Sequence, residues 1–276
     1  MTFLPDKVLI TGASSMIGWY VNFGIRPSRE ELDITDASAV AAFMRGVKPC
    51  AILHLAALTD MRYCEEHPDE AMRVNAESTG ALAKAAKEVG AKFVYVSTNA
   101  VFDGAKATPY DENDIPSPRT EYGRSKFAGE MAVKKYAGEW LIVRTSRVFG
   151  GGKAGDKRFV GKIISQLHES EIRAIDDCLD TPTYAKDVMQ EILELMREGR
   201  TGIVHVTNSG IASRFLQAKY IADFFGYRGQ LTPVRLKDFQ LIPPPLRNEA
   251  LVSKTVHLRS WQEALEEYLK KEWIKL

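Results

Sequence analysis

The chain lacks the features that would place it in a membrane, outside a cell or on a nucleic acid. Its three cysteines, Cys50, Cys64 and Cys178, are odd in number and widely spaced, which excludes a disulfide framework or cysteine metal motif and favours a reducing cytoplasm. No apolar run approaches the roughly 18 residues of a membrane-spanning helix. The 37 basic and 36 acidic residues nearly balance, and no basic run indicates nucleic-acid binding. We also expect no signal peptide, because a strand pattern begins almost at the first residue.

Short apolar runs alternate instead with helical patterns. The expected buried strands are 7–10, 51–56, 93–97 and 141–144. The expected helices are 40–47, capped by Thr35-Asp36, 68–89 and 122–137. This alternation predicts an α/β fold, a Rossmann-like doubly wound parallel sheet with helices on both faces. Ligands of such sheets bind at the carboxyl ends of the strands.

The pattern changes after Gly150. We therefore expect a dinucleotide-binding domain at 1–150 and a small carboxyl-terminal substrate lobe at 151–276, some of whose segments return to the first domain. The last helix should begin at a capping box of Ser260 and Glu263. Its apolar stripe is Trp261, Leu265, Leu269 and Trp273.

A glycine loop, 11–18, follows the first strand. Gly12 and Gly18 would let the backbone approach a pyrophosphate, but Ser15 stands where a third glycine is usual. Only 19–22 then separate this loop from a possible second strand at 23–25, whereas a normal crossover needs at least about 10–12 residues. The intervening helix must be very short, or the local topology altered.

The end of that second strand also lacks the acidic residue that usually reads the adenosine ribose. Arg26 and Arg29 follow, and an arginine there would accept the 2′-phosphate of NADPH. The alternative is that both are solvated surface charges, so NADPH and NADH stay open. Asp33 is placed to meet the adenine.

Tyr122 and Lys126 are four residues apart in an expected helix, so they share one face. A cation ~4 Å from a phenol at an effective dielectric constant of ~20 is worth about 4 kcal/mol, enough to lower its pKa and make it a usable proton donor to a carbonyl oxygen. Thr98 or Ser97, ending a strand, would hydrogen-bond the same oxygen. The alternative is an ordinary solvated helix face, because this spacing also arises by chance.

In the order and spacing of its motifs, nearly the whole chain resembles the extended short-chain dehydrogenase/reductases, specifically the dTDP-4-dehydrorhamnose reductase-like group. The motifs are Leu32-Asp-Ile-Thr-Asp36, Ala56-Ala-Leu-Thr-Asp60, Cys64-Glu-Glu, Val74-Asn-Ala76, Ser97-Thr98 with Val101-Phe-Asp-Gly104, Pro109-Tyr-Asp-Glu112, Tyr122-Gly-Arg-Ser-Lys126 with Gly129-Glu130, Arg144-Thr-Ser146 and Thr181-Pro-Thr183.

The resemblance implies that Thr98, Tyr122 and Lys126 are catalytic, with Lys126 also binding the nicotinamide ribose. Asn99 stands where related sugar dehydratases have an acid, which disfavours dehydration. The cofactor-contacting residues are expected to be Gly12, Ser14, Ser15, Met16, Ile17, Gly18, Arg26, Asp33, Ile34, Ala56, Ala57, Thr59 and Ser97, together with Tyr122 and Lys126. The substrate-binding residues are expected to be Asn99, Ala100, Arg147, Thr181 and Arg247, and no metal site is expected.

Three departures from this group concern the substrate site. Ala100 replaces a usual tyrosine, Arg147 a usual aromatic residue, and Pro245-Leu-Arg247-Asn-Glu249 a usual Arg-Pro-(Lys)-x-Ser. A fourth is the short crossover. An arginine at 147 would suit a more anionic substrate, unless it points away or pairs with an acidic neighbour.

Two functions are compatible with the sequence. The first is reduction of a 4-keto nucleotide sugar or similar carbonyl by NADPH or NADH, with a small molecule as partner, no nucleic acid or membrane, and a homodimer as one possible assembly. The second is a non-catalytic cofactor-binding protein that resembles the regulatory subunit of methionine adenosyltransferase. The intact Tyr-Lys pair favours the enzyme, and the altered substrate positions and short crossover favour the binder.

Overall fold

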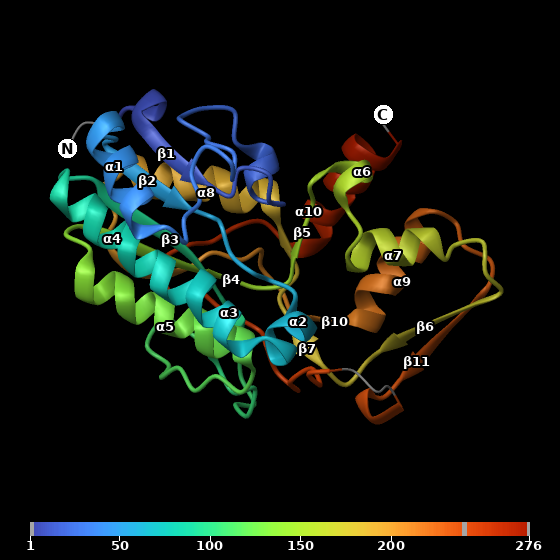
Figure 1. Ribbon diagram of the computed structural model, residues 1–276. Helices are drawn as coiled ribbons and strands as arrows, with labels where there is room; N and C mark the ends of the chain where they lie inside the picture. The colour runs from blue at the N-terminus through green and yellow to red at the C-terminus, as the bar shows by residue number, and fades with distance from the viewer. Residues whose placement is uncertain (1–2, 239–241, 275–276) are drawn as a thin grey trace.

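The computed structural model describes residues 3–238 and 242–274, so the ends of both expected domains, 1–2 and 275–276, lie outside it. Five strands form one parallel sheet in the order β1-β2-β3-β4-β9 (Figure 1). They are β1 (Val8–Thr11), β2 (Ala51–His54), β3 (Lys92–Thr98), β4 (Trp140–Thr145) and β9 (Gly202–His205). The expected strands are confirmed, with ends shifted by one or two residues.

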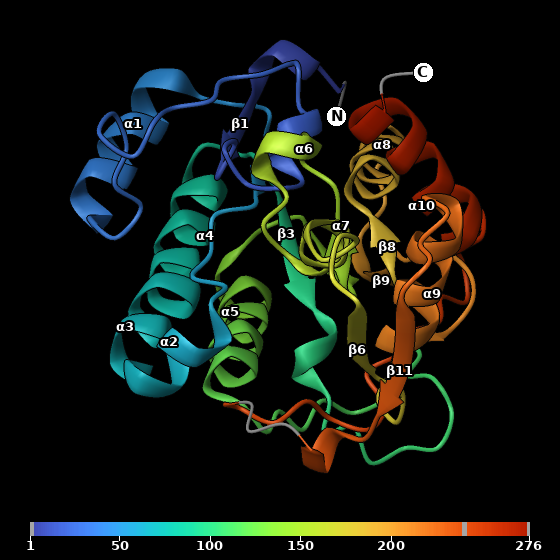
Figure 2. The same ribbon diagram turned by 90° about the vertical axis from the view of Figure 1, so that its right-hand side faces the viewer.

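Helices cover both faces of this sheet, as the doubly wound prediction requires. Alternate residues of each strand point to opposite faces. Leu9, Ile52 and Phe93 pack toward α1 (Ala37–Val47), α4 (Ser78–Glu88) and α5 (Glu121–Tyr136). Val8, Leu53 and Val94 pack toward α8 (Ala185–Arg197) on the other face (Figure 2).

The helix expected at 68–89 is one helical run with an irregular middle. It consists of α3 (Pro68–Met72), a π-helical turn η3 (Arg73–Glu77) and α4, and α2 (Met61–Glu66) precedes it. Asp36 caps α1 as predicted, accepting from the amides of Ser38 and Ala39.

The first crossover is as short as the sequence indicated. Only a 3-10 turn, η2 (Gly18–Tyr20), follows the glycine loop, and the expected second strand is reduced to a single parallel pairing of Ile25 with Leu9. Ile17 and Val21 are buried in the core beneath α8, so this short segment fills space that a longer helix would otherwise cover.

The carboxyl-terminal lobe, at the right of Figure 1, has its own core. Trp261, Phe149 and Ile172 lie in it, and the capping box of Ser260 and Glu263 is confirmed. Its elements are β5 (Val148–Phe149), α6 (Gly152–Gly155), α7 (Phe159–Ser165), β6 (Glu171–Ile175), β7 (Leu179–Asp180), β8 (Thr183–Tyr184), β10 (Ala212–Ser213), α9 (Arg214–Phe224), β11 (Gln230–Val234), α10 (Trp261–Tyr268) and η6 (Leu269–Ile274). Helix α8 and strand β9 come from the same half of the sequence but belong to the sheet domain.

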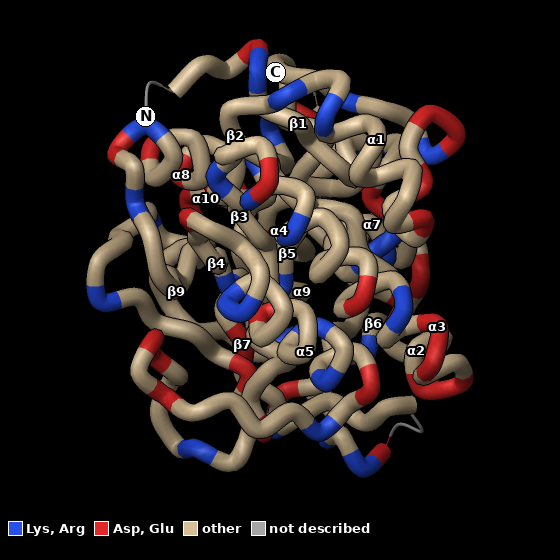
Figure 3. The backbone as a smooth tube through the Cα atoms, turned by 60° about the vertical axis from the view of Figure 1, so that its left-hand side comes forward, with Lys and Arg blue, Asp and Glu red and all other residues tan. Residues whose placement is uncertain are grey.

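Charges of both signs are mixed along the backbone (Figure 3), in line with the near balance of acidic and basic residues. Within residues 3–238 and 242–274, no helix combines the length and apolarity needed to cross a membrane.

Candidate active site

Helix α5 approaches the end of β3 unusually closely, and glycines make this possible. A Cβ atom at Gly123 would lie 2.1 Å from the carbonyl oxygen of Ala100, and one at Gly129 would lie 2.4 Å from the hydroxyl of Tyr95. Thr120 caps the helix by accepting a hydrogen bond from the amide of Gly123. This packing brings the first turn of α5, with Tyr122, against the residues that follow β3.

Tyr122 meets Thr98 there. Burial raises the pKa of the Tyr122 phenol above its ordinary value, while a hydrogen bond with the Thr98 hydroxyl and the charge of Arg158 act in the opposite direction. The expectation that the Lys126 cation lowers this pKa is therefore wrong, because burial raises the pKa and the opposing charge is that of Arg158, not of Lys126. The phenol is consequently protonated at neutral pH, which is the form that donates a proton.

Lys126 is buried one turn further along α5. Its ammonium donates to the carbonyl oxygen of Val96 at 2.8 Å and lies 4.1 Å from the centre of the Tyr95 ring. Burial lowers the pKa of Lys126 to about 7, and the carboxylate of Glu130 opposes this. The lysine therefore has an accessible neutral form near physiological pH.

Ser97 has a different role from its neighbour. Its hydroxyl donates to the carboxylate of Glu130 at 2.6 Å, and Glu130 also binds the guanidinium of Arg144 at 2.8 and 2.7 Å. All three residues are buried. Of the two hydroxyls proposed from the sequence for the carbonyl oxygen, the one of Thr98 faces Tyr122.

Asn75 connects the segment after β2 to α5. Its amide side chain accepts from the amide of Leu58 at 2.8 Å and donates to the carbonyl of Leu58 at 2.9 Å and to the Ser125 hydroxyl at 2.9 Å. Asn75 lies in the π-helical turn, a local irregularity that often occurs at functional sites. It thus fixes the loop of Ala56, Ala57 and Thr59 relative to α5.

The glycine loop has the form of a phosphate cradle. Gly12 has φ +74° and its absent side chain would collide with the backbone of Ala56 at 2.4 Å, so the loop lies close to the end of β2. Within the described residues, the amides of Ser14, Met16 and Ile17 make no hydrogen bond, whereas the Gly18 amide donates to the Ser15 hydroxyl at 3.1 Å. Unpaired amides in such a loop suit a pyrophosphate.

The residues expected at the adenosine end follow β1 in the sequence. The Asp33 carboxylate accepts from the amide and hydroxyl of Thr35, contacts that lower its pKa. Arg26 is exposed, and its guanidinium donates to the carbonyl of Val21 at 2.9 Å. Arg29 is also exposed, and its positive charge contributes to lowering the pKa of Asp33. Ile34 packs on the core beside Leu32.

The expected substrate residues differ in what they can offer. Asn99 and Ala100 are buried directly after Thr98, and the Ala100 amide donates to the Thr98 hydroxyl at 3.2 Å. Thr181 is buried, and its hydroxyl donates to the carbonyl of Leu251, so its proton is already engaged. Arg247 is exposed.

Arg147 is paired with two carboxylates. Its Nε donates to Asp180 at 2.7 Å and its Nη2 donates to Glu249 at 2.8 Å. Pairing with an acidic neighbour was the alternative to an anionic substrate, and it is the arrangement present. Burial raises the pKa of Asp180 to about 6, although Arg147 opposes the shift.

Arg158 is a site residue that sequence reasoning missed. It stands at the start of α7 in the carboxyl-terminal lobe and donates to the Thr59 hydroxyl, in the segment after β2, at 3.0 Å. Sequence reasoning also missed Asp180, Tyr95 and the hydrogen bonds by which Asn75 holds the segment after β2 against α5. Only Asn75 gave a signal, as part of a family motif, because the other contacts join segments far apart in the sequence.

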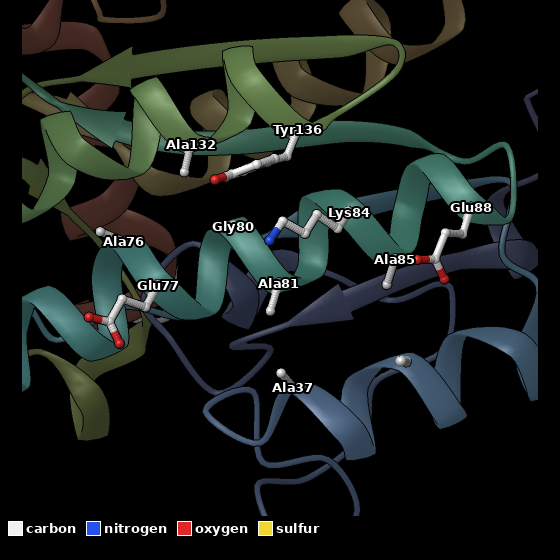
Figure 4. A pocket seen from close by; sticks show the side chains of 11 residues that line it. Ala37, Ala76, Glu77, Gly80, Ala81, Lys84, Ala85, Glu88, Ala132 and Tyr136 are labelled. Carbon is white, nitrogen blue, oxygen red and sulfur yellow. The ribbon is translucent and has the colours of Figure 1, made fainter.

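A hollow on the outer side of the helices lies away from these residues. It has a volume of about 590 Å³ and lies on the outer helices α1, α4 and α5, where Lys84 and Tyr136 point toward one another (Figure 4). None of the residues that line it is an expected site residue, so it is separate from the candidate site at the carboxyl ends of the strands.

Comparison with known proteins agrees with this geometry. The spore coat polysaccharide biosynthesis protein SpsK of Bacillus subtilis is 30% identical over 95% of this chain and 96% of its own length. A dTDP-4-dehydrorhamnose reductase of Mycobacterium tuberculosis is 33% identical over 94% of this chain and 91% of its own. The crystal structure of dTDP-4-dehydrorhamnose reductase from Bacillus anthracis in complex with NADP has a TM-score of 0.90 and 32% identity, covering 96% of this chain and 99% of that one.

These similarities extend over both lobes, and the resemblance drawn from the sequence motifs is confirmed. Residues 6–273 match the family described as RmlD substrate binding domain. The chain belongs to the RmlD substrate binding domain family.

Proposed function

We propose that the protein is a reductase that converts the C4 carbonyl of a nucleotide-linked 4-keto sugar into a hydroxyl group, using NADPH or NADH. The observation that carries the proposal is the meeting of a protonated Tyr122 phenol with the Thr98 hydroxyl at the carboxyl end of β3. The names of the reductases from M. tuberculosis and B. anthracis support the same reaction.

Side chains of the protein orient the carbonyl oxygen and supply its proton. When bound, the reduced nicotinamide supplies the hydride. The Thr98 hydroxyl would turn its proton from the Asn99 side chain to the carbonyl oxygen and orient that oxygen. Tyr122 gives its proton to the same oxygen as the carbon is reduced. With a pKa near 7, Lys126 can return a proton to the resulting phenolate from one helical turn away.

The loop and the ends of β1 and β2 fit the cofactor. The unpaired amides of Ser14, Met16 and Ile17 would hold the pyrophosphate, and Lys126 would bind the nicotinamide ribose. Arg26 and Arg29 would meet a 2′-phosphate, which favours NADPH over NADH. The remaining expected cofactor contacts are Gly12, Ser15, Gly18, Asp33, Ile34, Ala56, Ala57, Thr59 and Ser97.

The test follows NADPH in the presence of purified protein. Binding should change the fluorescence of NADPH, and addition of a dTDP-linked 4-keto-6-deoxy sugar should then oxidise it and yield the C4 alcohol. Absence of oxidation across a panel of nucleotide-linked 4-keto sugars would reject the proposal.

A second candidate is a non-catalytic cofactor-binding protein of the kind found as the regulatory subunit of methionine adenosyltransferase. The observation in its favour is the 3-10 turn at Gly18–Tyr20, which leaves little helix behind the phosphate cradle. This candidate predicts NADPH binding with no turnover of any carbonyl, so the same assay separates the two functions.

The setting of the enzyme is also part of the proposal. A cytoplasmic location is expected, since the three cysteines are free, and a homodimer is one possible assembly. Cell fractionation tests the location, and light scattering of the eluted protein tests the assembly.

A further inference from the structure

The short first crossover leaves the glycine loop without the long helix that follows such a loop in an ordinary doubly wound sheet. Only the 3-10 turn η2 comes after it. The Trp19 amide donates to the carbonyl of Ser15 at 2.8 Å, and the Tyr20 amide donates to the carbonyl of Ile17 at 3.2 Å. The turn and the loop are therefore one continuous hydrogen-bonded unit, and a contact that fixes Tyr20 also helps to fix the loop.

Tyr20 reaches from this turn into the carboxyl-terminal lobe. Its ring packs against the cores of both lobes and meets the Tyr184 ring edge-on, with 5.6 Å between the ring centres. Its hydroxyl donates to Oε1 of Glu272 at 2.7 Å, and the Tyr184 hydroxyl donates to the same oxygen. Glu272 lies in η6, 252 residues further along the chain, in the red segment of Figure 1. A carboxylate of the last helical segment thus holds the end of the glycine loop.

The Tyr20 hydroxyl makes two hydrogen bonds, one as a donor and one as an acceptor. Burial, together with the hydrogen bond to Glu272, raises the pKa of the phenol, so it keeps its proton at neutral pH. The same oxygen accepts from the amide of Gly151 at 3.0 Å. This one side chain therefore joins three segments, which are η2, η6 and the loop after β5.

The loop after β5 also packs closely on the glycine loop. A Cβ atom at Gly151 would lie 3.4 Å from Cγ of Met16, and one at Gly152 would lie 3.3 Å from the Trp19 ring. Met16 is one of the residues whose unpaired amides suit a pyrophosphate. The carboxyl-terminal lobe is thus in contact with the phosphate cradle itself as well as with the turn behind it.

We propose that Tyr20 and Glu272 are positioning residues of the cofactor site, an inference that rests on the proposed use of NADPH or NADH. The segment η6 anchors the glycine loop, as the first crossover helix does in an ordinary doubly wound sheet. Without this anchor the loop also adopts forms that cannot hold a pyrophosphate. The apparent Kd for the cofactor then rises by the inverse of the competent fraction, while the chemistry at Thr98 and Tyr122 is unchanged once the cofactor is bound.

The test measures the Kd for NADPH by fluorescence, and separately kcat at saturating NADPH. Tyr20→Phe keeps the ring between the two cores and loses the hydroxyl, whereas Glu272→Ala loses the acceptor. Each should raise the Kd and the KM for NADPH about tenfold, roughly the value of one hydrogen bond to a charged group. Each should leave kcat within about twofold of the wild type, because the interactions made in the transition state are kept.

Two matched variants separate positioning from a general loss of stability. Glu272→Gln keeps an oxygen acceptor at the same place, so it should bind NADPH more tightly than Glu272→Ala. Glu267→Gln weakens ion pairs in the same carboxyl-terminal region, but its partners are Lys186 and Arg259 rather than Tyr20. It should keep the wild-type affinity for NADPH even where urea unfolds it more easily.

An unchanged Kd in both Tyr20→Phe and Glu272→Ala would overturn the inference, and so would a fall in kcat with no change in Kd. An equal loss of affinity in Glu267→Gln would overturn it too, since the effect would then follow stability alone. If the unaltered protein binds NADPH but no 4-keto sugar oxidises it, only the proposed reduction is rejected, because the Kd values still decide the inference. If it binds neither NADPH nor NADH, both are rejected.

Discussion

The two ends of the sugar site are built differently. At the proton-transfer end, Thr98 and Tyr122 follow the pattern of the family, and they come from β3 and α5, elements that pack directly together. At the sugar end, Arg147, Asp180 and Glu249 come from three separate segments, and two of them depart from that pattern. The two sets of residues therefore lie on different segments, so that substitutions can alter one set while the other is kept.

The largest expected effect is at the proton-transfer end. Tyr122→Phe removes the proposed general acid and should lower kcat/KM by about 10²–10⁴-fold, while the Kd for NADPH stays close to that of the wild type. The initial rate of NADPH oxidation measures it. Tyr136→Phe, later on the same helix, is the matched control and should retain full activity, whereas full activity in Tyr122→Phe would refute the assigned role.

At the sugar end the largest effect should be on stability. Arg147→Met removes the cation that is hydrogen-bonded to Asp180 and Glu249 and leaves only the charge of Arg214 near them, so we expect the free energy of unfolding to fall by about 3 kcal/mol. Urea unfolding measures it. Adding Asp180→Asn and Glu249→Gln to the same chain should restore much of the loss; a loss below about 1 kcal/mol in Arg147→Met would show that the cluster is weakly coupled to the fold.

Lys126 gives a smaller effect that depends on pH. Its pKa is about 7 in the folded protein, below its ordinary value, so between pH 7 and about 10 the unfolded chain binds more protons and stability rises with pH. Relative to Lys126→Met, the wild type should gain about 2 kcal/mol between pH 7 and pH 9. Unfolding curves at several pH values test this, and parallel profiles for the two proteins would contradict it.

The smallest expected effect concerns the cofactor. Replacing Arg26 and Arg29 with alanine should weaken NADPH binding by about fivefold and leave NADH binding unchanged, because exposed charge pairs contribute little. Fluorescence titration with both cofactors measures it, with Arg45→Ala on α1 as a control. Equal loss for both cofactors, or tight NADH binding in the unaltered protein, would argue against recognition of a 2′-phosphate.

Much of the fold could be predicted because it depends on local patterns. Leu9, Ile52 and Phe93 lie in short apolar runs, which are typical of strands covered by helices on both faces. The short connection after Gly18 could be predicted from the small number of residues between the glycine loop and the next apolar segment. The π-helical turn around Asn75 could not be predicted, because its apolar pattern matches that of an ordinary helix.

The site residues could be predicted where a single helix carries them. The spacing of Tyr122 and Lys126 within α5 placed both residues, but burial, which the spacing does not reveal, changed the expected direction of the Tyr122 pKa. The ion pairs of Arg147 and the contact of Arg158 with Thr59 join residues far apart in sequence. Such contacts depend on how the lobes pack, and no local pattern specifies them.

The central claim is that hydride passes to C4 of a nucleotide-linked sugar at the site of Tyr122 and Thr98. The most direct measurement uses NADPH that carries deuterium at the transferable position, with nuclear magnetic resonance of the sugar product. We expect one deuterium atom on C4 in the wild type, and a greatly reduced yield of that product with Tyr122→Phe. Oxidation of the cofactor without deuterium at C4, or no product from any 4-keto sugar, would contradict it.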